Sequence, residues 1–504
     1  RDYYASRGLG DVYKRQDNVN LMDFQRIDEL HDIGYNRTIS MMDSIKSRIH
    51  RRVNLDNIRL RRMVYRSNFP ELRFKNIIID GANPQQQAYM KKEFHKSDNK
   101  EFTYEDLKQG YFRLLSDKMI SEIIPHAIYN PEDDTYDLHL KVKLENNFAV
   151  RLGGNISTSN SNQIYLGLSY QDLNYYAKEF ILDGQLGKVY NNVQFMAKID
   201  FATAIPTSYR LIGSISTFDY FKKDKLFSRN NKPAFNQKDE RFLKLQVGLP
   251  FLSSKRAEFG VGIARIEDKY FQKSVIDFGN DKFDKSRYDL FGGSISFNGS
   301  TLNSKQYPTR GYREALVAQI FVGKERFYPG EGSTTSNNKD HHSWLQLSYM
   351  KEKYHNMSEH WVLGWYLKAL YASKNFSENY TATMMQAGEF SPTLHSKLTY
   401  NEAFRANQFV GAGIRPIYRL SQMFHLRGEF YGFMPIYPIE KNSLNKAYYG
   451  KAFSKFEYLG EISVVCQLPF GDISAYVNHY SSPRREWNVG LSIGFQLFNY
   501  RFIE

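Results

Sequence analysis

The feature that most restricts the fold of this chain is a strict alternation of apolar and polar residues, clearest near its C-terminal end. One set of alternate positions is apolar: Trp487, Val489, Leu491, Ile493, Phe495 and Leu497. The other set is polar or small: Asn488, Gly490, Ser492, Gly494 and Gln496. Because successive side chains of a β-strand point to opposite faces, residues 487–498 predict a strand with one face for lipid and one for a polar lumen.

The same alternation recurs upstream. It is seen in the segments around Leu152, Leu166 and Ile295. Backbone groups inside a bilayer must all be paired, which favours a closed sheet over an open one. Residues 147–504 comprise 358 positions, and at about 22 residues for each strand and connection they allow roughly sixteen strands. The pattern therefore predicts an antiparallel transmembrane β-barrel of about 16 strands.

Composition agrees with a barrel and excludes a helical membrane protein. Aromatic residues make up 15% of the chain, mean hydropathy is −0.57, and no run of 18 apolar residues occurs. The formal charge of +14 is spread over loops and lumen positions and mixed with 54 acidic residues, so we expect contact with anionic headgroups and no nucleic-acid partner. The single Cys466 is predicted to be an apolar filler.

The N-terminal region has a different character. Residues 1–16 look unlike their continuation and are interpreted as a non-native scar, and because no signal peptide is visible the chain is expected to be a fragment. Residues 17–71 predict helices followed by a basic linker: Phe24, Ile27, Leu30 and Ile33 follow helical spacing, Gly34 could end that helix, and Thr38 to Ile49 continues.

Residues 72–146 predict one small α+β domain. A strand over 72–79 is followed by the turn Asp80–Pro84, whose proline is placed to open a helix. Thr103 and Asp106 form a capping-box-like start to a second helix. Strands are expected over 120–129 and 136–144, which gives the order β-α-α-β-β.

That order, directly ahead of a barrel, resembles a polypeptide-transport-associated (POTRA) domain, and the barrel resembles the bacterial surface antigen superfamily of outer-membrane insertases and secretion pores. The most specific motif is the Pro-x-x-Gly strand entry in residues 303–312, with Pro308, Arg310 and Gly311. Residues 468–474 resemble the penultimate strand. The terminal strand is expected to carry Trp487, Gly490, Gly494, Phe495 and Phe498. The resemblance implies a bacterial outer-membrane location, a periplasmic POTRA-like domain, and the barrel assembly machinery and lipids as partners.

One departure from the superfamily concerns its Arg-Gly motif, carried by a loop that folds into the lumen. The matching stretch here, from Gly388 through Phe409, contains no Arg-Gly. Arg405 could replace that arginine, with Glu429 or Asp472 as its acidic partner. The alternative is that Arg405 is an ordinary lumen residue.

Residues 18–50, especially 27–35, resemble the last helices of a patatin-like phospholipase domain, and in one bacterial branch such a domain precedes a single POTRA domain and this kind of barrel. The resemblance implies a parent that is a Ser-Asp lipid acyl hydrolase. Its dyad would lie upstream, so we assign no catalytic residue to this chain. Ser492 fits the Gly-x-Ser-x-Gly spelling and Asp80 the Asp-Gly-Ala turn, yet Ser492 lies in a predicted strand with no helix to follow.

Two functional hypotheses result. The first is an anchor or translocation module of a patatin-like phospholipase, whose POTRA-like edge could bind a passenger domain or an extended peptide. The alternative is an outer-membrane protein insertase or a two-partner-secretion type transporter; a plain diffusion porin is disfavoured by residues 72–145. No metal or cofactor site is predicted, and His341, His342, His355 and His360 are interpreted as solvated loop residues.

Overall fold

The computed structural model describes residues 27–49, 54–67, 71–94, 101–158, 162–201, 205–219, 236–252, 254–271, 282–330, 333, 338–482 and 487–504. The proposed scar over 1–16 and the helical position Phe24 lie outside the described residues. The chain divides into two compact units, residues 1–72 and residues 73–504.

Three helices lie among the described residues of the first unit: α2 (Ile27–Ser40), α3 (Met42–Arg48) and α4 (Leu55–Ser67). The expected helix end at Gly34 is wrong, because α2 continues for a further six residues and the Thr38 hydroxyl donates to the Gly34 carbonyl within it. Neither α3 nor α4 buries a side chain. None of the described helices is long and apolar enough to cross a membrane.

The second unit begins with residues 73–144, called here the α+β segment. Its elements are β1 (Arg73–Asp80), α5 (Pro84–Phe94), β2 (Phe102–Thr103), α6 (Tyr104–Leu115), β3 (Ile120–Asn130) and β4 (Thr135–Leu144). The sheet order is β2-β1-β4-β3, with β1 parallel to β4. The predicted order is confirmed; the sequence did not reveal β2, which has only two residues.

Local signals explain where these elements start. Thr103 accepts a hydrogen bond from the Asp106 amide, and the Asp106 side chain accepts from the Thr103 amide, so the predicted capping box is present. Gly81 has φ +88°, and a Cβ there would lie 2.2 Å from the Val142 carbonyl oxygen. Only glycine fits this tight turn between β1 and α5.

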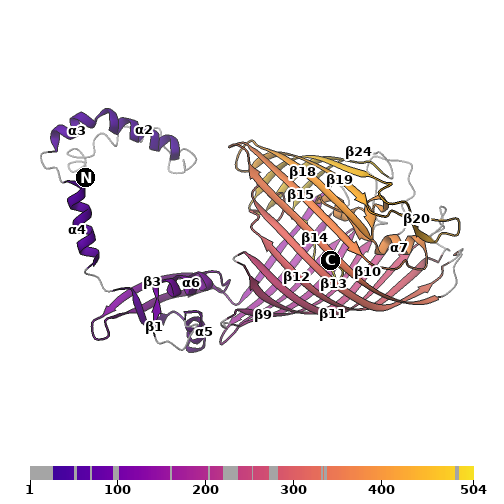
Figure 1. Cartoon of the computed structure of the whole chain (residues 1–504), viewed down its shortest axis with the longest axis horizontal. Coiled ribbons are helices and arrows are strands. Elements are labelled where there is room, and N and C mark those ends of the chain that lie inside the picture. Colours follow the sequence, from indigo (N-terminus) through magenta and orange to yellow (C-terminus); the bar gives the residue numbers. More distant parts are fainter. Residues whose placement is uncertain are drawn as a thin grey trace. The chain divides into compact units, whose positions relative to one another are not determined.

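The rest of the second unit is a barrel of sixteen antiparallel strands that closes on itself (Figure 1). The first half comprises β5 (Phe148–Ser157), β6 (Gln163–Leu173), β7 (Ala177–Gly187), β8 (Tyr190–Phe201), β9 (Thr207–Asp219), β10 (Asn236–Phe251), β11 (Lys255–Tyr270) and β12 (Asp284–Ser300). The second half comprises β13 (Gly311–Tyr328), β14 (Asn338–Asn356), β15 (Trp361–Ala372), β18 (Gln408–Arg419), β19 (Phe424–Pro435), β22 (Glu457–Leu468), β23 (Gly471–Tyr480) and β24 (Trp487–Gly494). The prediction of a mainly β, sixteen-stranded barrel preceded by a small α+β part is confirmed.

Alternation along each strand produces two chemically different faces. The outward positions are apolar and exposed, for example Leu152 at 80% and Ile164 at 71%. The inward positions are polar and buried, for example Gln185 and Arg427, each at 1%. Since only alternate residues meet lipid, a barrel can be hydrophilic on average and still be a membrane protein.

The end of the terminal strand is a correction to the sequence prediction. β24 stops at Gly494, whose φ is +116° and where a Cβ would lie 2.2 Å from the Gly154 carbonyl oxygen. The chain leaves the wall at this glycine, so Phe495 and Phe498 are not members of the strand. Alternation continues beyond Gly494, but after the Phe495 amide donates to the Gly154 carbonyl of β5 the described chain forms no further ladder with the wall.

Candidate functional site

A long loop, residues 373–407, connects β15 to β18 and folds against the inner wall. It contains α7 (Tyr380–Gln386), β16 (Gly388–Glu389), two short 3-10 turns (His395–Leu398 and Glu402–Phe404) and β17 (Arg405–Ala406). Asn379 caps α7 and donates to the Tyr270 hydroxyl of β11 at 2.7 Å, while Gln386 donates to Asp268. The loop is therefore fixed to the wall by polar contacts.

A hairpin covers part of this loop. It consists of β20 (Ile439–Lys441) and β21 (Ala447–Tyr449), in the connection between β19 and β22. Ile439 packs with Met384 and Ala387 in one apolar cluster. Loop 373–407 is consequently held between the wall and this hairpin.

Buried charges on the inner side of β14, β18 and β19 form one network. Glu429 of β19 pairs with Arg427 on the same strand and with Arg415 of β18, which also pairs with Glu352 of β14. The Tyr354 hydroxyl accepts from Arg427 at 2.9 Å. Because each of these carboxylates faces a guanidinium, the network compensates its own charge and is suited to fixing structure rather than to acid-base chemistry.

This network also holds the two chain segments that enter the lumen. Arg415 donates to the Pro392 carbonyl of loop 373–407 at 3.2 Å. Arg427 donates to the Pro308 carbonyl of the turn between β12 and β13 at 2.8 Å. One buried cluster thus ties both segments to the same part of the wall.

The predicted pairing of Arg405 with Glu429 or Asp472 is wrong. The acidic partner recorded for Arg405 is Glu389, at 2.9 Å, and its guanidinium also donates to the Met385 and Ala387 carbonyls. The reason is local: β16 and β17 pair and bring Glu389 opposite Arg405. Asp472 is buried at the start of β23 and accepts no hydrogen bond through Oδ2 among the described residues.

The Pro-x-x-Gly motif forms an ordered turn rather than a simple strand start. The Asn303 side chain accepts from the Thr309 and Arg310 amides, both at 3.0 Å, and β13 begins at Gly311 with φ +91°. The Tyr307 hydroxyl donates to Ser474 on β23 at 3.0 Å. The turn therefore reaches from β12 and β13 to the wall strands β19 and β23.

The wall has one weak junction, where β24 meets β5; we call it the seam. Among the described residues, the ladder between these strands has three residue pairs: Asn155 with Gly494, Ile156 with Ile493, and Ser157 with Ser492. One backbone hydrogen bond flanks it at each end, from the Thr158 amide to the Leu491 carbonyl and from the Phe495 amide to the Gly154 carbonyl. Every other neighbouring pair of wall strands shares from eight to seventeen pairs. The expected terminal-strand residues Trp487 and Gly490 lie in β24 beyond these seam pairs.

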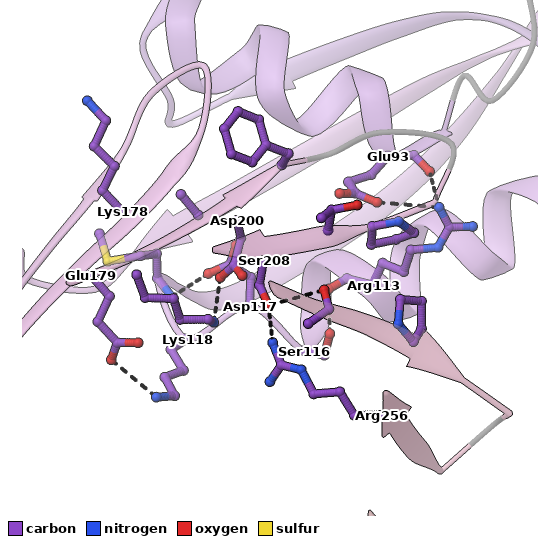
Figure 2. A pocket seen from close by; sticks show the side chains of 18 of the residues that line it. Glu93, Arg113, Ser116, Asp117, Lys118, Lys178, Glu179, Asp200, Ser208 and Arg256 are labelled. Atoms are coloured by element: carbon purple, nitrogen blue, oxygen red, sulfur yellow. Dashed lines mark hydrogen bonds and ion pairs between the residues drawn. The ribbon is translucent and has the colours of Figure 1, made fainter. Parts of the chain in front are cut away.

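A cleft of about 450 Å³ lies where the α+β segment meets the barrel turns (Figure 2). Its charged residues are largely paired: Lys118 with Glu179 at 3.2 Å, and Arg113 with Glu93. The Tyr89 hydroxyl donates to Asp117 at 3.0 Å, and burial raises the pKa of this phenol above its usual value, so it remains a neutral donor. Leu173 of β6 packs into the core of the α+β segment. The Lys118–Glu179 ion pair and the packing of Leu173 join the segment to the barrel.

The serine, aspartate and histidine residues considered in the sequence analysis do not form a catalytic site. Ser492 lies in the seam, where its hydroxyl donates to Asn155 at 2.6 Å, and Asp80 ends β1 in the α+β segment. His342 is a correction: it is buried and lies 2.8 Å from Glu325 rather than being solvated. Within the described ranges, no group of three His, Cys, Asp or Glu residues could hold a metal ion.

Comparison with known proteins identifies the fold. No family model and no curated protein matches the sequence. Among solved structures, BamA from Haemophilus ducreyi lacking POTRA domains 1–3 is similar, with TM-score 0.57, 12% identity and 84% of each chain covered. CdiB from Acinetobacter baumannii has TM-score 0.49, 9% identity and coverage of 84% of this chain and 74% of that one.

The chain is thus a sixteen-stranded outer-membrane β-barrel with a BamA-like fold. Its apolar exterior and polar interior are what a bilayer requires, so the protein is located in the outer membrane. No comparison supports the phospholipase interpretation of residues 18–50.

Proposed function

We propose that this protein inserts or transports polypeptides at the outer membrane, and that the seam is the place where the wall opens. The observation that carries the proposal is the three-pair junction between β24 and β5. At about 0.5–1.5 kcal/mol for each net hydrogen bond, a junction this short is held far less firmly than neighbours with up to seventeen pairs.

The edge of β5 supports a role in strand addition. In the described chain, Phe148–Gly153 pair with β6 but with no strand on the opposite side, because β24 ends at the level of Asn155. Unpaired N–H and C=O groups along an edge accept an extended strand from another chain. A polypeptide entering the wall would find its first partner there.

The α+β segment, interpreted as a POTRA-like domain over 72–146 ahead of a barrel over 147–504, offers a second edge. β3 lies at the border of its sheet, and most of its side chains are exposed. We place this segment on the periplasmic side, where β3 would receive an extended client or passenger peptide. Pro125 lacks an N–H donor and restricts how such a peptide pairs there.

The phospholipase interpretation stays a prediction about residues upstream of this chain. If the parent carried such a domain, the barrel would serve as its anchor and the POTRA-like segment would contact it. The sequence of the upstream DNA tests whether such a domain exists.

The test of the seam is a reversible cross-link. Ser157→Cys with Ser492→Cys places two thiols at facing positions across the seam, in a chain whose Cys466 is replaced by Ala. After refolding into lipid vesicles, oxidation should lower the rate of insertion or passage of an unfolded outer-membrane polypeptide at least tenfold, and reduction should restore it.

A matched control shares one of these cysteines. Ser474 and Ser492 face each other in the continuous ladder between β23 and β24. Ser474→Cys with Ser492→Cys should therefore leave the rate unchanged when oxidised. Full activity of the oxidised seam pair would show that the wall does not open at the seam.

A further inference from the structure

After β24 the chain does not end in the wall but continues along the inside of the barrel. Residues 495–504, called here the tail, form hydrogen bonds with side chains of six wall strands: β6, β7, β8, β10, β13 and β14. The C label in Figure 1 lies over β13 and β14, the strands whose Gln319 and Gln346 bind residue 504. The tail therefore crosses from the seam to a distant part of the wall.

Wall side chains hold the tail mainly by its backbone. Gln163 donates to the Leu497 carbonyl and accepts from the Leu497 amide, both at 3.1 Å. Gln319 donates to the Phe502 carbonyl at 3.1 Å and accepts from the Glu504 amide at 3.0 Å. A carboxamide that satisfies both an N–H and a C=O replaces a partner strand. Such contacts recognise an extended chain with little regard to its sequence.

Two side chains of the tail are recognised more specifically: the Asn499 carboxamide, which accepts from Gln185 and donates to Asn192, and the Phe502 ring. Phe502 is buried in a cluster with Phe242, Phe321 and Trp344, and its amide donates to Glu240 at 2.8 Å. A Cβ on Gly292 would lie 3.1 Å from the Phe502 ring. The wall is therefore shaped to receive an aromatic ring at this position.

The tail is also fastened to loop 373–407. The Arg501 guanidinium lies 3.6 Å from Glu389, the same carboxylate that binds Arg405. The Lys397 ammonium lies 5.6 Å from the centre of the Phe498 ring. Release of the tail thus requires breaking contacts with the loop as well as with the wall.

We propose that this row of luminal side chains, from Gln163 on β6 to Gln346 on β14, is a binding track for an extended polypeptide with an aromatic residue, and that the tail is its built-in occupant. The class of ligand rests on the proposed function, since a protein that handles unfolded polypeptides meets such segments. A tethered tail competes at a high effective concentration, so it keeps the track filled until a client displaces it.

The probe is a fluorescent synthetic peptide with the sequence of residues 495–504, added to the full chain refolded in detergent micelles. Wild-type protein should bind it weakly because its own tail occupies the track. Phe502→Ala removes the tail's aromatic anchor and should increase affinity for the peptide at least tenfold, measured by fluorescence anisotropy. Adding Gln319→Ala to this variant should abolish the gain, because the two backbone contacts that Gln319 makes, to positions 502 and 504, are lost.

The controls separate binding from folding. Phe470→Ala removes a ring that is 79% exposed, and should leave peptide affinity at the wild-type value. Gel mobility before and after boiling checks that each variant is folded. Arg501→Ala, whose side chain is 44% exposed, loosens the tail without altering the wall and should give a smaller gain in the same direction.

The proposed track would be overturned if wild type, Phe502→Ala and Arg501→Ala bound the peptide with equal affinity. It would also be overturned if the gain in affinity of Phe502→Ala persisted after Gln319→Ala was added. The binding assay needs no insertion or transport activity. If the peptide binds as expected but the oxidised seam pair is fully active, the proposed opening of the seam is rejected and the track is supported. If oxidation of the seam pair blocks activity but the variants bind the peptide no better than wild type, only the track is rejected.

Discussion

β4 in the α+β segment and β6 in the barrel show the same alternation of apolar and polar residues. The apolar residues are buried in β4, whereas the polar residues are buried in β6. In β4 the apolar Leu138 and Leu140 are buried at 1% and 0%. In β6 the apolar Ile164 is 71% exposed, while Gln163 is buried. The difference teaches that alternation specifies two faces, and the surrounding solvent decides which face is inside.

The largest expected effect comes from breaking the polar interior of the barrel. Glu429→Ala leaves Arg427 and Arg415 buried without their shared carboxylate, and should lower the free energy of unfolding by about 3–5 kcal/mol. Urea titration in vesicles measures this, because all four tryptophans lie in the barrel. Asp289→Asn, which loosens the half-exposed pair with Arg265, should cost about 0–1 kcal/mol. Equal costs would mean that the buried network does not stabilise the barrel.

Two leucine-to-alanine substitutions compare the buried apolar residues of the α+β segment with the exposed apolar residues of the barrel. Leu140→Ala opens a cavity in the α+β segment and should cost about 2–5 kcal/mol of its local stability, measured by hydrogen exchange. Leu152→Ala, on the barrel exterior, should cost less, because lipid chains fill the vacated space and no cavity remains. A larger cost at Leu152 would contradict the assignment of its face to lipid.

A charged residue placed on the outer face of the barrel tests whether lipid covers that face. Ile320 lies in the middle of β13 and is 61% exposed. Ile320→Arg should lower barrel stability by about 2–4 kcal/mol if this position is near the bilayer midplane. The conservative Ile320→Leu serves as control and should cost under about 1.5 kcal/mol in the same urea titration. A tolerated arginine would argue that water, not lipid, covers this face.

Part of the candidate site could be predicted from the sequence. The sequence predicts Glu429 as a lumen residue, and in the structure its carboxylate is buried between Arg427 and Arg415. It predicts Pro308 as a strand entry, whereas the structure shows a turn whose Pro308 carbonyl accepts from Arg427. A further signal was available: Arg427 and Glu429 are two residues apart in one strand, so they share a face. Arg415 could not be added from the sequence, since nothing local tells which strand will lie beside β19.

The sequence by itself determined the strand count, the two faces of the wall, the capping of α6 and the order of the α+β segment, because these depend on residues a few positions apart. Only the tertiary structure decided that Arg405 meets Glu389, that β24 leaves the wall at Gly494, and that the tail crosses the lumen to Gln319. Such contacts join residues up to hundreds of positions apart. Their geometry is set by how sixteen tilted strands close into a barrel, which no local pattern encodes.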